Sequence, residues 1–200
     1  VMSQQRVALI TGGMGGLGET ISTKMADAGY RVAVTYSPSN KGASAWVEQM
    51  KSRGYAFRAY ACDVADYDSA QKCVEKVSGE VGPVDILVNN AGITRDGLSM
   101  RMSPEDWNSV IATNLGGAFN FYQGVARAMM KQRSGRIINI ASVAGIRGLP
   151  GHAAYCSSKA AVISYCESLR GECRPFGVKV LTIAPGYVAT PLTSKNRYGM

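Results

Sequence analysis

The chain has 200 residues, of which 46% are hydrophobic and 18% charged, and its formal net charge is +8. These proportions fit a single soluble globular domain over residues 1–200 rather than a disordered protein. No apolar run is long enough to span a bilayer, and the basic residues are scattered, so neither a membrane nor a nucleic acid is expected as a partner.

Cysteine usage and the N-terminal residues bear on the compartment. The odd number of cysteines and the absence of a C-x-x-C pair argue against a disulfide framework and a zinc site, so no metal is expected. The first residues run into a short apolar strand without the features of a signal peptide. A cytoplasmic protein is therefore expected. The five cysteines are Cys62, Cys73, Cys156, Cys166 and Cys173.

Short apolar segments rich in valine and isoleucine alternate with amphipathic stretches along the whole chain. The predicted strands are residues 6–10, 31–36, 55–61, 84–89, 135–141 and 178–183. The predicted helices are residues 17–28, 42–53, 67–81, 104–132 and 153–174. This alternation predicts an α/β fold with a doubly wound parallel sheet (Rossmann fold), helices on both faces, and ligands at the carboxyl ends of the strands.

Residues typical of helix ends stand at the boundaries of these predicted elements. Gly29 and Gly54 follow the first two predicted helices, where glycine commonly ends a helix. Ser103 and Pro104 read as an N-cap and a first helical residue. The segment 175–177, Pro-Phe-Gly, is expected to end the last helix before the sixth strand.

A glycine-rich turn, residues 11–18 (TGGMGGLG), joins the first strand to the first helix. Such a turn lets the backbone approach a pyrophosphate, whose charge the helix N-terminus stabilises. Glycine-rich turns also serve simple chain reversal, but the position after the first strand favours dinucleotide binding. The candidate residues here are Gly12, Met14, Gly16, Leu17 and Gly18.

Further segments in the same order along the chain complete a pattern that resembles the short-chain dehydrogenase/reductase family. They are Asp63-Val64 after the third strand, the N-N-A-G string of residues 89–92 after the fourth, and P-G-Y-V-A-T at residues 185–190. The resemblance implies that the first two line the adenosine side of the cofactor and the third approaches its nicotinamide. The implied contact residues are Asp63, Val64, Asn90, Ala91, Gly92, Pro185, Gly186, Val188 and Thr190.

The end of the second strand indicates which dinucleotide is bound. NAD-binding members of this fold usually hold the ribose 2′-hydroxyl with an acid there, but residues 31–46 contain no Asp or Glu. Ser37 and Lys41 suit a 2′-phosphate, so NADPH is favoured over NAD. The alternative is that Lys41 is a solvated residue at a helix start and that cofactor preference is loose.

A Y-x-x-x-K motif supplies the candidate catalytic pair, Tyr155 and Lys159, which share a helix face at this spacing. A free tyrosine has a pKa near 10, and a nearby ammonium is expected to lower it. The family resemblance adds Ser142 as the group that polarises the substrate and Asn114 as the holder of a water in a proton relay. It implies hydride transfer to a carbonyl carbon with Tyr155 as general acid and Lys159 also binding the nicotinamide ribose.

Within the family, the string NNAGITRD at residues 89–96 is similar to acetoacetyl-CoA reductases, and residues 112–120 and 134–145 equally resemble 3-oxoacyl-acyl-carrier-protein reductases. The expected substrate is a small carbonyl compound or 3-oxoacyl thioester, on either carrier. His152, the only histidine, is expected to be a bystander to acid–base chemistry. The candidate substrate residues are Asp96, Ser142, Leu149, His152, Tyr155 and Tyr187.

Family members usually continue for several tens of residues past the P-G segment, with a lid, a seventh strand and part of an oligomer interface. The resemblance therefore predicts that residues 1–200 lack the last strand and the lid. Two functions stay open: a homo-oligomeric reductase, or a catalytically weak or inactive dinucleotide-binding module.

Overall fold

A computed structural model of the chain describes residues 5–190 and 193–194. Its strands form one parallel sheet in the order β3-β2-β1-β4-β5-β6, the doubly wound arrangement that the sequence predicts. The direction of winding reverses between β1 and β4, where a ligand crevice is expected. The strands are β1 Val7–Ile10, β2 Arg31–Tyr36, β3 Arg58–Ala61, β4 Val84–Asn89, β5 Gly135–Ile140 and β6 Val178–Ile183.

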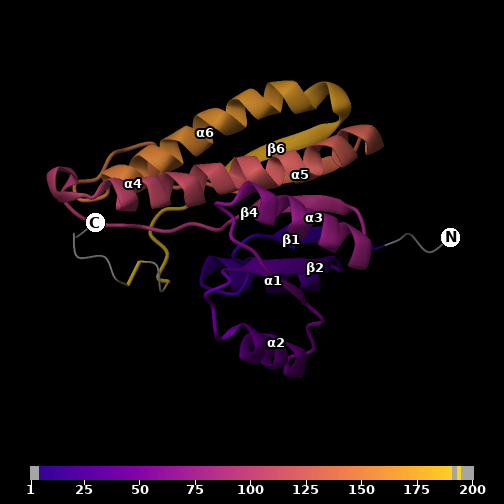
Figure 1. The fold of residues 1–200 in the computed structure, drawn as a ribbon. Coiled ribbons are helices and arrows are strands. Elements are labelled where there is room, and N and C mark those ends of the chain that lie inside the picture. Colours follow the sequence, from indigo (N-terminus) through magenta and orange to yellow (C-terminus); the bar gives the residue numbers. More distant parts are fainter. Residues whose placement is uncertain (1–4, 191–192, 195–200) are drawn as a thin grey trace.

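Helices cover both faces of this sheet (Figure 1). The core on one face packs α3, α5 and α6 against the sheet, and the core on the other packs α1 and α2 against β1 to β4. On β6, at the edge of the sheet, Leu181 and Ile183 stay 43% and 46% exposed. The helices are α1 Leu17–Asp27, α2 Ala43–Ser52, α3 Tyr67–Glu80, α4 Pro104–Ile111, α5 Gly117–Gln132 and α6 Ala153–Cys173.

The predicted helix ends are confirmed by backbone and capping geometry. Gly29 and Gly54 adopt φ of +85° and +89°, which side chains with a Cβ rarely tolerate. Ser103 Oγ accepts a hydrogen bond of 3.1 Å from the Asp106 amide, with Pro104 in the first helical turn.

Two predicted elements needed correction. The strand predicted at 55–61 starts only at Arg58, because Tyr55 and Phe57 stack on each other and Phe57 stacks on Trp46 of α2. The helix predicted at 104–132 is interrupted by a π-helical turn, Ala112–Gly116. Such turns often occur at functional sites, and this one carries Asn114.

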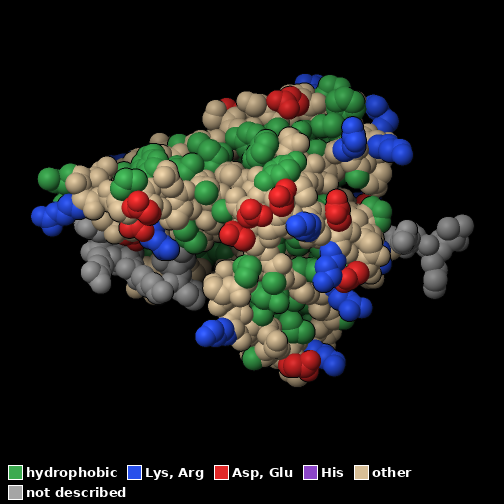
Figure 2. Space-filling model, in the orientation of Figure 1, with side chains coloured by type: hydrophobic (Ala, Val, Ile, Leu, Met, Phe, Trp, Pro, Cys, Tyr) green, Lys and Arg blue, Asp and Glu red, His purple; other side chains and the backbone are tan. Residues whose placement is uncertain are grey.

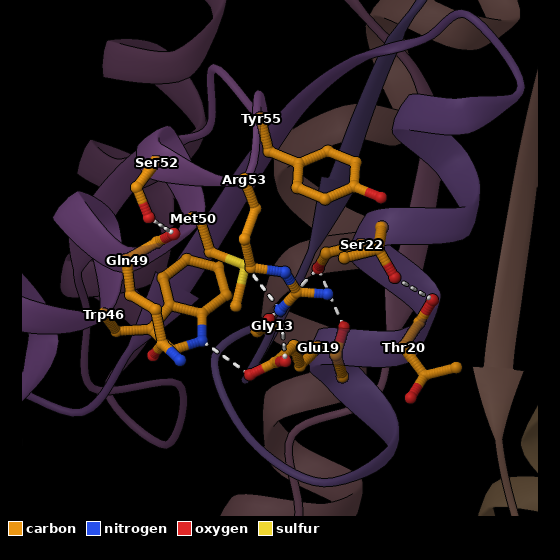
Figure 3. A network of polar contacts seen from close by, with 12 residues as sticks. Gly13, Glu19, Thr20, Ser22, Trp46, Gln49, Met50, Ser52, Arg53 and Tyr55 are labelled. Carbon is orange, nitrogen blue, oxygen red and sulfur yellow. Dashed lines mark hydrogen bonds and ion pairs between the residues drawn. The ribbon is translucent and has the colours of Figure 1, made fainter.

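A polar network holds α2 against α1 (Figure 3). Glu19 accepts a hydrogen bond of 2.8 Å from Trp46 Nε1 and pairs with Arg53 Nη1 at 3.3 Å. Arg53 also lies over the Tyr55 ring, 5.7 Å from its centroid. The network fixes α2, which follows the loop at the end of β2.

We expect Glu19→Ala to lower the free energy of unfolding by about 1 kcal/mol, because the part-buried Trp46 indole loses its acceptor while the exposed ion pair contributes little. Urea unfolding measures the change. Glu48→Ala on the exposed side of α2 is the matched control and should change stability less. Equal effects of the two substitutions would contradict a stabilising role for the network.

The surface charge is dispersed. On the face drawn in Figure 2, Lys and Arg side chains are interspersed with Asp and Glu side chains over several elements. Among the described residues, no helix combines the length and apolar character needed to cross a membrane, and no cluster of three or more His, Cys, Asp or Glu side chains could hold a metal ion.

Candidate active site

A cleft of about 460 Å³ opens at the carboxyl ends of the strands, a size typical of small-molecule sites. It brings together residues from the turns after β1 to β6, and most of the predicted cofactor residues line it. These are Gly12, Gly16, Leu17, Ser37, Asp63, Val64, Asn90, Ala91, Gly92, Tyr155, Lys159, Pro185, Gly186, Val188 and Thr190.

The glycine turn has the geometry for close approach of a ligand to the backbone. Gly12 and Gly16 adopt φ of +61° and +51°, and α1 begins at Leu17, so its N-terminus faces the cleft. A Cβ at Gly18 would collide with the carbonyl oxygen of Gly12. Gly18 therefore lets the first turn of α1 pack against the glycine turn, although it does not line the cleft.

Asn90 fixes the glycine turn from β4. Its Nδ2 donates to the carbonyl oxygens of Thr11 and Gly12 at 3.0 and 3.1 Å. The Thr11 hydroxyl in turn accepts from the amides of Asn90 and Ala91, both at 3.0 Å. The predicted contact residue Asn90 thus also joins the loop after β4 to the glycine turn after β1.

The loop after β2 places Ser37 in the wall of the cleft, with its Oγ 2.8 Å from that of Ser39. Asn40 Nδ2 lies 3.9 Å from the sulfur of Met14, which joins this loop to the glycine turn. Lys41 is exposed next to it, and neither Met14 nor Lys41 is among the lining residues of this cleft. Both predicted residues thus lie beside the cleft rather than in its wall.

Tyr155 and Lys159 lie on one face of α6, and both line the cleft. The Lys159 ammonium is 5.7 Å from the centroid of the Tyr155 ring and donates to the Ile140 carbonyl at 2.7 Å. Ser142, just past β5, hydrogen-bonds the Tyr155 hydroxyl. A Cβ at Gly145 would lie 2.6 Å from the carbonyl carbon of Lys159, so glycine there lets the turn carrying Ser142 pack on α6.

The pKa of Tyr155 shifts opposite to the expectation from the sequence. Burial raises it, and the hydrogen bond from Ser142 opposes that rise. Burial also lowers the pKa of Lys159 to about 8. The Lys159 ammonium donates its hydrogen bond to the Ile140 carbonyl. The raised pKa of Tyr155 follows its burial. Tyr155 is therefore protonated at neutral pH, as a proton donor must be.

Asn114 hydrogen-bonds protein groups with both side-chain atoms. Its Oδ1 accepts from the Ile93 amide at 2.8 Å, and its Nδ2 donates to the Ile93 carbonyl at 3.1 Å and to Ser158 Oγ at 2.9 Å. Asn114 therefore ties the loop after β4 to α6 beside Lys159, which identifies it as a positioning residue. The predicted water in a proton relay stays a prediction.

All six predicted substrate residues line a second pocket, of about 80 Å³, which shares Ser142, Tyr155, Gly186 and Thr193 with the cleft. The predicted set is Asp96, Ser142, Leu149, His152, Tyr155 and Tyr187. The reacting groups thus stand where the two hollows meet.

His152 is more than a loop residue. It is 7% exposed, and its Nδ1 lies 2.9 Å from Asp96 Oδ1. A backbone hydrogen bond of 2.8 Å from the Gly97 amide to the Gly151 carbonyl runs beside this pair. Together they join the loop after β4 to the segment that leads into α6 and Tyr155.

We expect Asp96→Ala to lower the free energy of unfolding by about 1–3 kcal/mol, because the buried His152 Nδ1 loses its carboxylate partner. Chemical unfolding of the variant beside Asp68→Ala, an exposed carboxylate on α3, tests this. If Asp96→Ala is no more destabilising than Asp68→Ala, the pair does not hold the two loops together.

The sequence analysis missed several lining residues, among them Gly15, Thr35, Cys62, Ile93 and Thr113. Gly15 lies inside the glycine-rich turn, and Cys62, Ile93 and Thr113 each adjoin a predicted site residue, so adjacency was the available signal for these four. Thr35 was hidden because it reads as a strand residue, yet its Oγ1 accepts from the Gly12 amide at 3.2 Å.

A family model described as short chain dehydrogenase matches residues 6–199. The chain belongs to the short-chain dehydrogenase/reductase family. It is 43% identical over 192 residues to the 3-oxoacyl-[acyl-carrier-protein] reductase FabG of Staphylococcus aureus, covering 96% of this chain and 78% of that protein. It is 42% identical over 193 residues to the acetoacetyl-CoA reductase of Cupriavidus necator, with the same coverage.

Nodulation protein G of Azospirillum brasilense is 44% identical over 188 residues, which cover 94% of this chain and 76% of that protein. Among solved structures, the crystal structure of gox2181 superposes with a TM-score of 0.89 at 34% identity, covering 96% of this chain and 75% of that one. The short-chain dehydrogenase/reductase fold and oxidoreductase class predicted from the motifs are thereby confirmed.

Proposed function

We propose that this short-chain dehydrogenase/reductase transfers hydride from NADPH to the keto group of a 3-oxoacyl thioester such as acetoacetyl-CoA. The observation that carries the proposal is that Ser142 and Tyr155 line both the cleft and the smaller pocket, with Lys159 beside them in the cleft wall. A dinucleotide in the cleft and a carbonyl in the pocket would meet at these residues.

The cleft fits a nicotinamide dinucleotide. A Cβ at Gly18 would be blocked by Gly12, so the backbone there is as close-packed as a pyrophosphate-binding turn requires. Asp63 and Val64 would hold the adenine, and Pro185 and Gly186 the nicotinamide end. When bound, the cofactor supplies the hydride.

The chain's own residues manage the proton and the charge. Tyr155 holds a proton at its hydroxyl, because burial raises its pKa, and donates it to the substrate oxygen. Ser142 hydrogen-bonds the same oxygen as charge develops. Lys159, whose ammonium donates to the Ile140 carbonyl, supplies positive charge beside the phenol. Asn114 accepts from the Ile93 amide and so holds the loop after β4 beside Lys159.

NADPH is preferred in this proposal because Ser37 lines the cleft at the end of β2 and Lys41 follows it with an exposed ammonium. No acid in residues 31–46 would hold a ribose 2′-hydroxyl or repel a 2′-phosphate. The proposed homo-oligomer draws support from α4 and α5, where Trp107 and Phe119 are 38% and 41% exposed.

The thioester is favoured by the two named relatives, whose names state reduction of acetoacetyl-CoA and of 3-oxoacyl groups on acyl carrier protein. The net charge of +8 would attract either acidic carrier. The smaller pocket has Leu149 and Tyr187 in its wall, which suits a short acyl chain.

The test is NADPH oxidation, followed by absorbance, with acetoacetyl-CoA as substrate and NADH as the matched cofactor. We expect turnover with a higher kcat/KM for NADPH than for NADH. Equal rates would overturn the cofactor preference. NADPH binding without turnover on acetoacetyl-CoA would overturn the reductase proposal and favour the alternative of a weak or inactive dinucleotide-binding module.

A further inference from the structure

Two buried thiols face each other between β3 and α3. Cys62 follows the last residue of β3, Cys73 lies in α3, and they are 2% and 5% exposed in the same hydrophobic cluster. Their side chains are hydrogen-bonded to each other. Ser69 Oγ, one turn before Cys73, also donates to Cys62 Sγ at 3.5 Å. The two sulfurs are therefore held together by packing and by polar contacts.

The thiol pair reaches the wall of the cleft. Cys62 is one of the lining residues, together with its neighbours Asp63 and Val64. The Asp63 amide donates to Ser69 Oγ at 3.1 Å, the same hydroxyl that contacts Cys62. A movement of Cys62 toward Cys73 would thus pull on the backbone of the segment proposed to hold the adenine.

The two thiols differ in acidity. The hydrogen bond from Cys73 lowers the pKa of Cys62, while the same contact and burial raise the pKa of Cys73. The deprotonated form is the nucleophile in thiol chemistry. Burial raises the pKa of Cys166 and of Cys173, so those buried cysteines on α6 are not activated in this way.

We propose that Cys62 and Cys73 form a modification site that a small hydroperoxide oxidises to a reversible disulfide. In this proposal the disulfide weakens dinucleotide binding in the cleft, and a bound dinucleotide disfavours the disulfide. The first half stands on the thiol pair alone. The second half rests on the proposed function, because it requires the cleft to hold the dinucleotide.

The reaction balances with the hydroperoxide as the two-electron oxidant. With hydrogen peroxide, Cys62 releases its proton and the thiolate attacks one oxygen, so that the O–O bond breaks and Cys62 becomes a sulfenic acid. The departing hydroxide takes up the released proton and forms the first water. The Cys73 sulfur then attacks the Cys62 sulfur, the S–O bond breaks, and the departing hydroxide takes the Cys73 thiol proton to form water. Two thiols and one hydrogen peroxide become one disulfide and two waters, and a dithiol reductant reverses the change.

The effect on cofactor binding follows from linkage. If the disulfide displaces the segment 62–64, it weakens dinucleotide binding, and the bound dinucleotide must disfavour the disulfide by the same factor. We expect the Kd for NADPH to rise about fivefold or more on oxidation, the lower end of typical couplings between sites. A dinucleotide in the cleft would cover Cys62, which lines its wall, and should slow the oxidation of this thiol.

The experiment treats the full chain with hydrogen peroxide, with and without NADPH, then blocks free thiols and digests with trypsin. Cleavage after Lys72 separates the two cysteines, so the disulfide appears as residues 59–72 joined to residues 73–76. The Kd for NADPH is measured on reduced, oxidised and re-reduced protein. Cys73→Ala and Cys173→Ala are the matched variants, each removing one buried thiol.

We expect the joined peptides in the parent and in Cys173→Ala but not in Cys73→Ala, with slower formation when NADPH is present. Absence of the joined peptides would overturn the site. Their formation with an unchanged Kd would overturn the opposition to cofactor. Should reduced protein fail to bind NADPH, the proposed function and the opposition both fail, and the joined peptides alone then decide whether the thiol site exists.

Discussion

Tyr155→Phe is expected to lower kcat/KM for NADPH-dependent reduction of acetoacetyl-CoA by about 10³-fold, within the range for loss of a general acid. The substitution removes the one hydroxyl that Ser142 hydrogen-bonds and that lies at the meeting point of cleft and pocket. The ring is retained, so its packing over the Lys159 ammonium, 5.7 Å from the centroid, should survive. NADPH binding should therefore change little.

Tyr165→Phe provides the matched control, because Tyr165 lies on the same helix but packs edge-on against Tyr122 in the core. Its kcat/KM should stay within about threefold of the parent, as no transition-state contact is lost. A Tyr155→Phe variant that retains parental kcat/KM would remove Tyr155 from the mechanism. A large loss in both variants would indicate damage to α6 rather than loss of a proton donor.

The sequence predicted the fold well because its signals are local. Apolar runs such as 84–89 match β4 residue for residue, and the left-handed φ of Gly29 and Gly54 fits the predicted helix ends. The site could be predicted for the same reason: parallel strands bring their carboxyl ends to one edge, so motifs distant in sequence meet there.

What the sequence could not predict depends on contacts between distant segments. The Asp96–His152 pair joins residues 56 positions apart, and His152 alone reads as a bystander. The π-helical turn at Ala112–Gly116 has no periodic signature in the sequence, and its Asn114 bonds the backbone of Ile93, 21 positions away. The rise in the Tyr155 pKa likewise depends on burial, which spacing within one helix does not reveal.

Lys159→Met is expected to stabilise the protein while impairing its activity. Burial lowers the pKa of Lys159 from 10.5 to about 8, so the folded protein binds this proton less tightly than the unfolded chain does. At pH 7 the buried charge lowers the free energy of unfolding by about 3 kcal/mol, and the hydrogen bond from Lys159 to Ile140 raises it by about 1 kcal/mol. Lys159→Met removes both, so we expect the free energy of unfolding to rise by about 2 kcal/mol. The charge beside Tyr155 is lost, which should lower kcat/KM about 10²-fold.

The stability gained by Lys159→Met is expected to decrease as the pH rises. Below pH 8 lysine is charged in both the folded and unfolded states, and the full cost is present. Between pH 8 and 10.5 the folded state releases the proton first, so the parent gains stability as pH rises and the advantage of Lys159→Met shrinks. Urea unfolding at pH 7 and pH 9.5 measures this, with the exposed Lys179→Met on β6 as control. A gain that is absent at pH 7, or the same at both pH values, would mean that burying the Lys159 charge does not cost the fold stability.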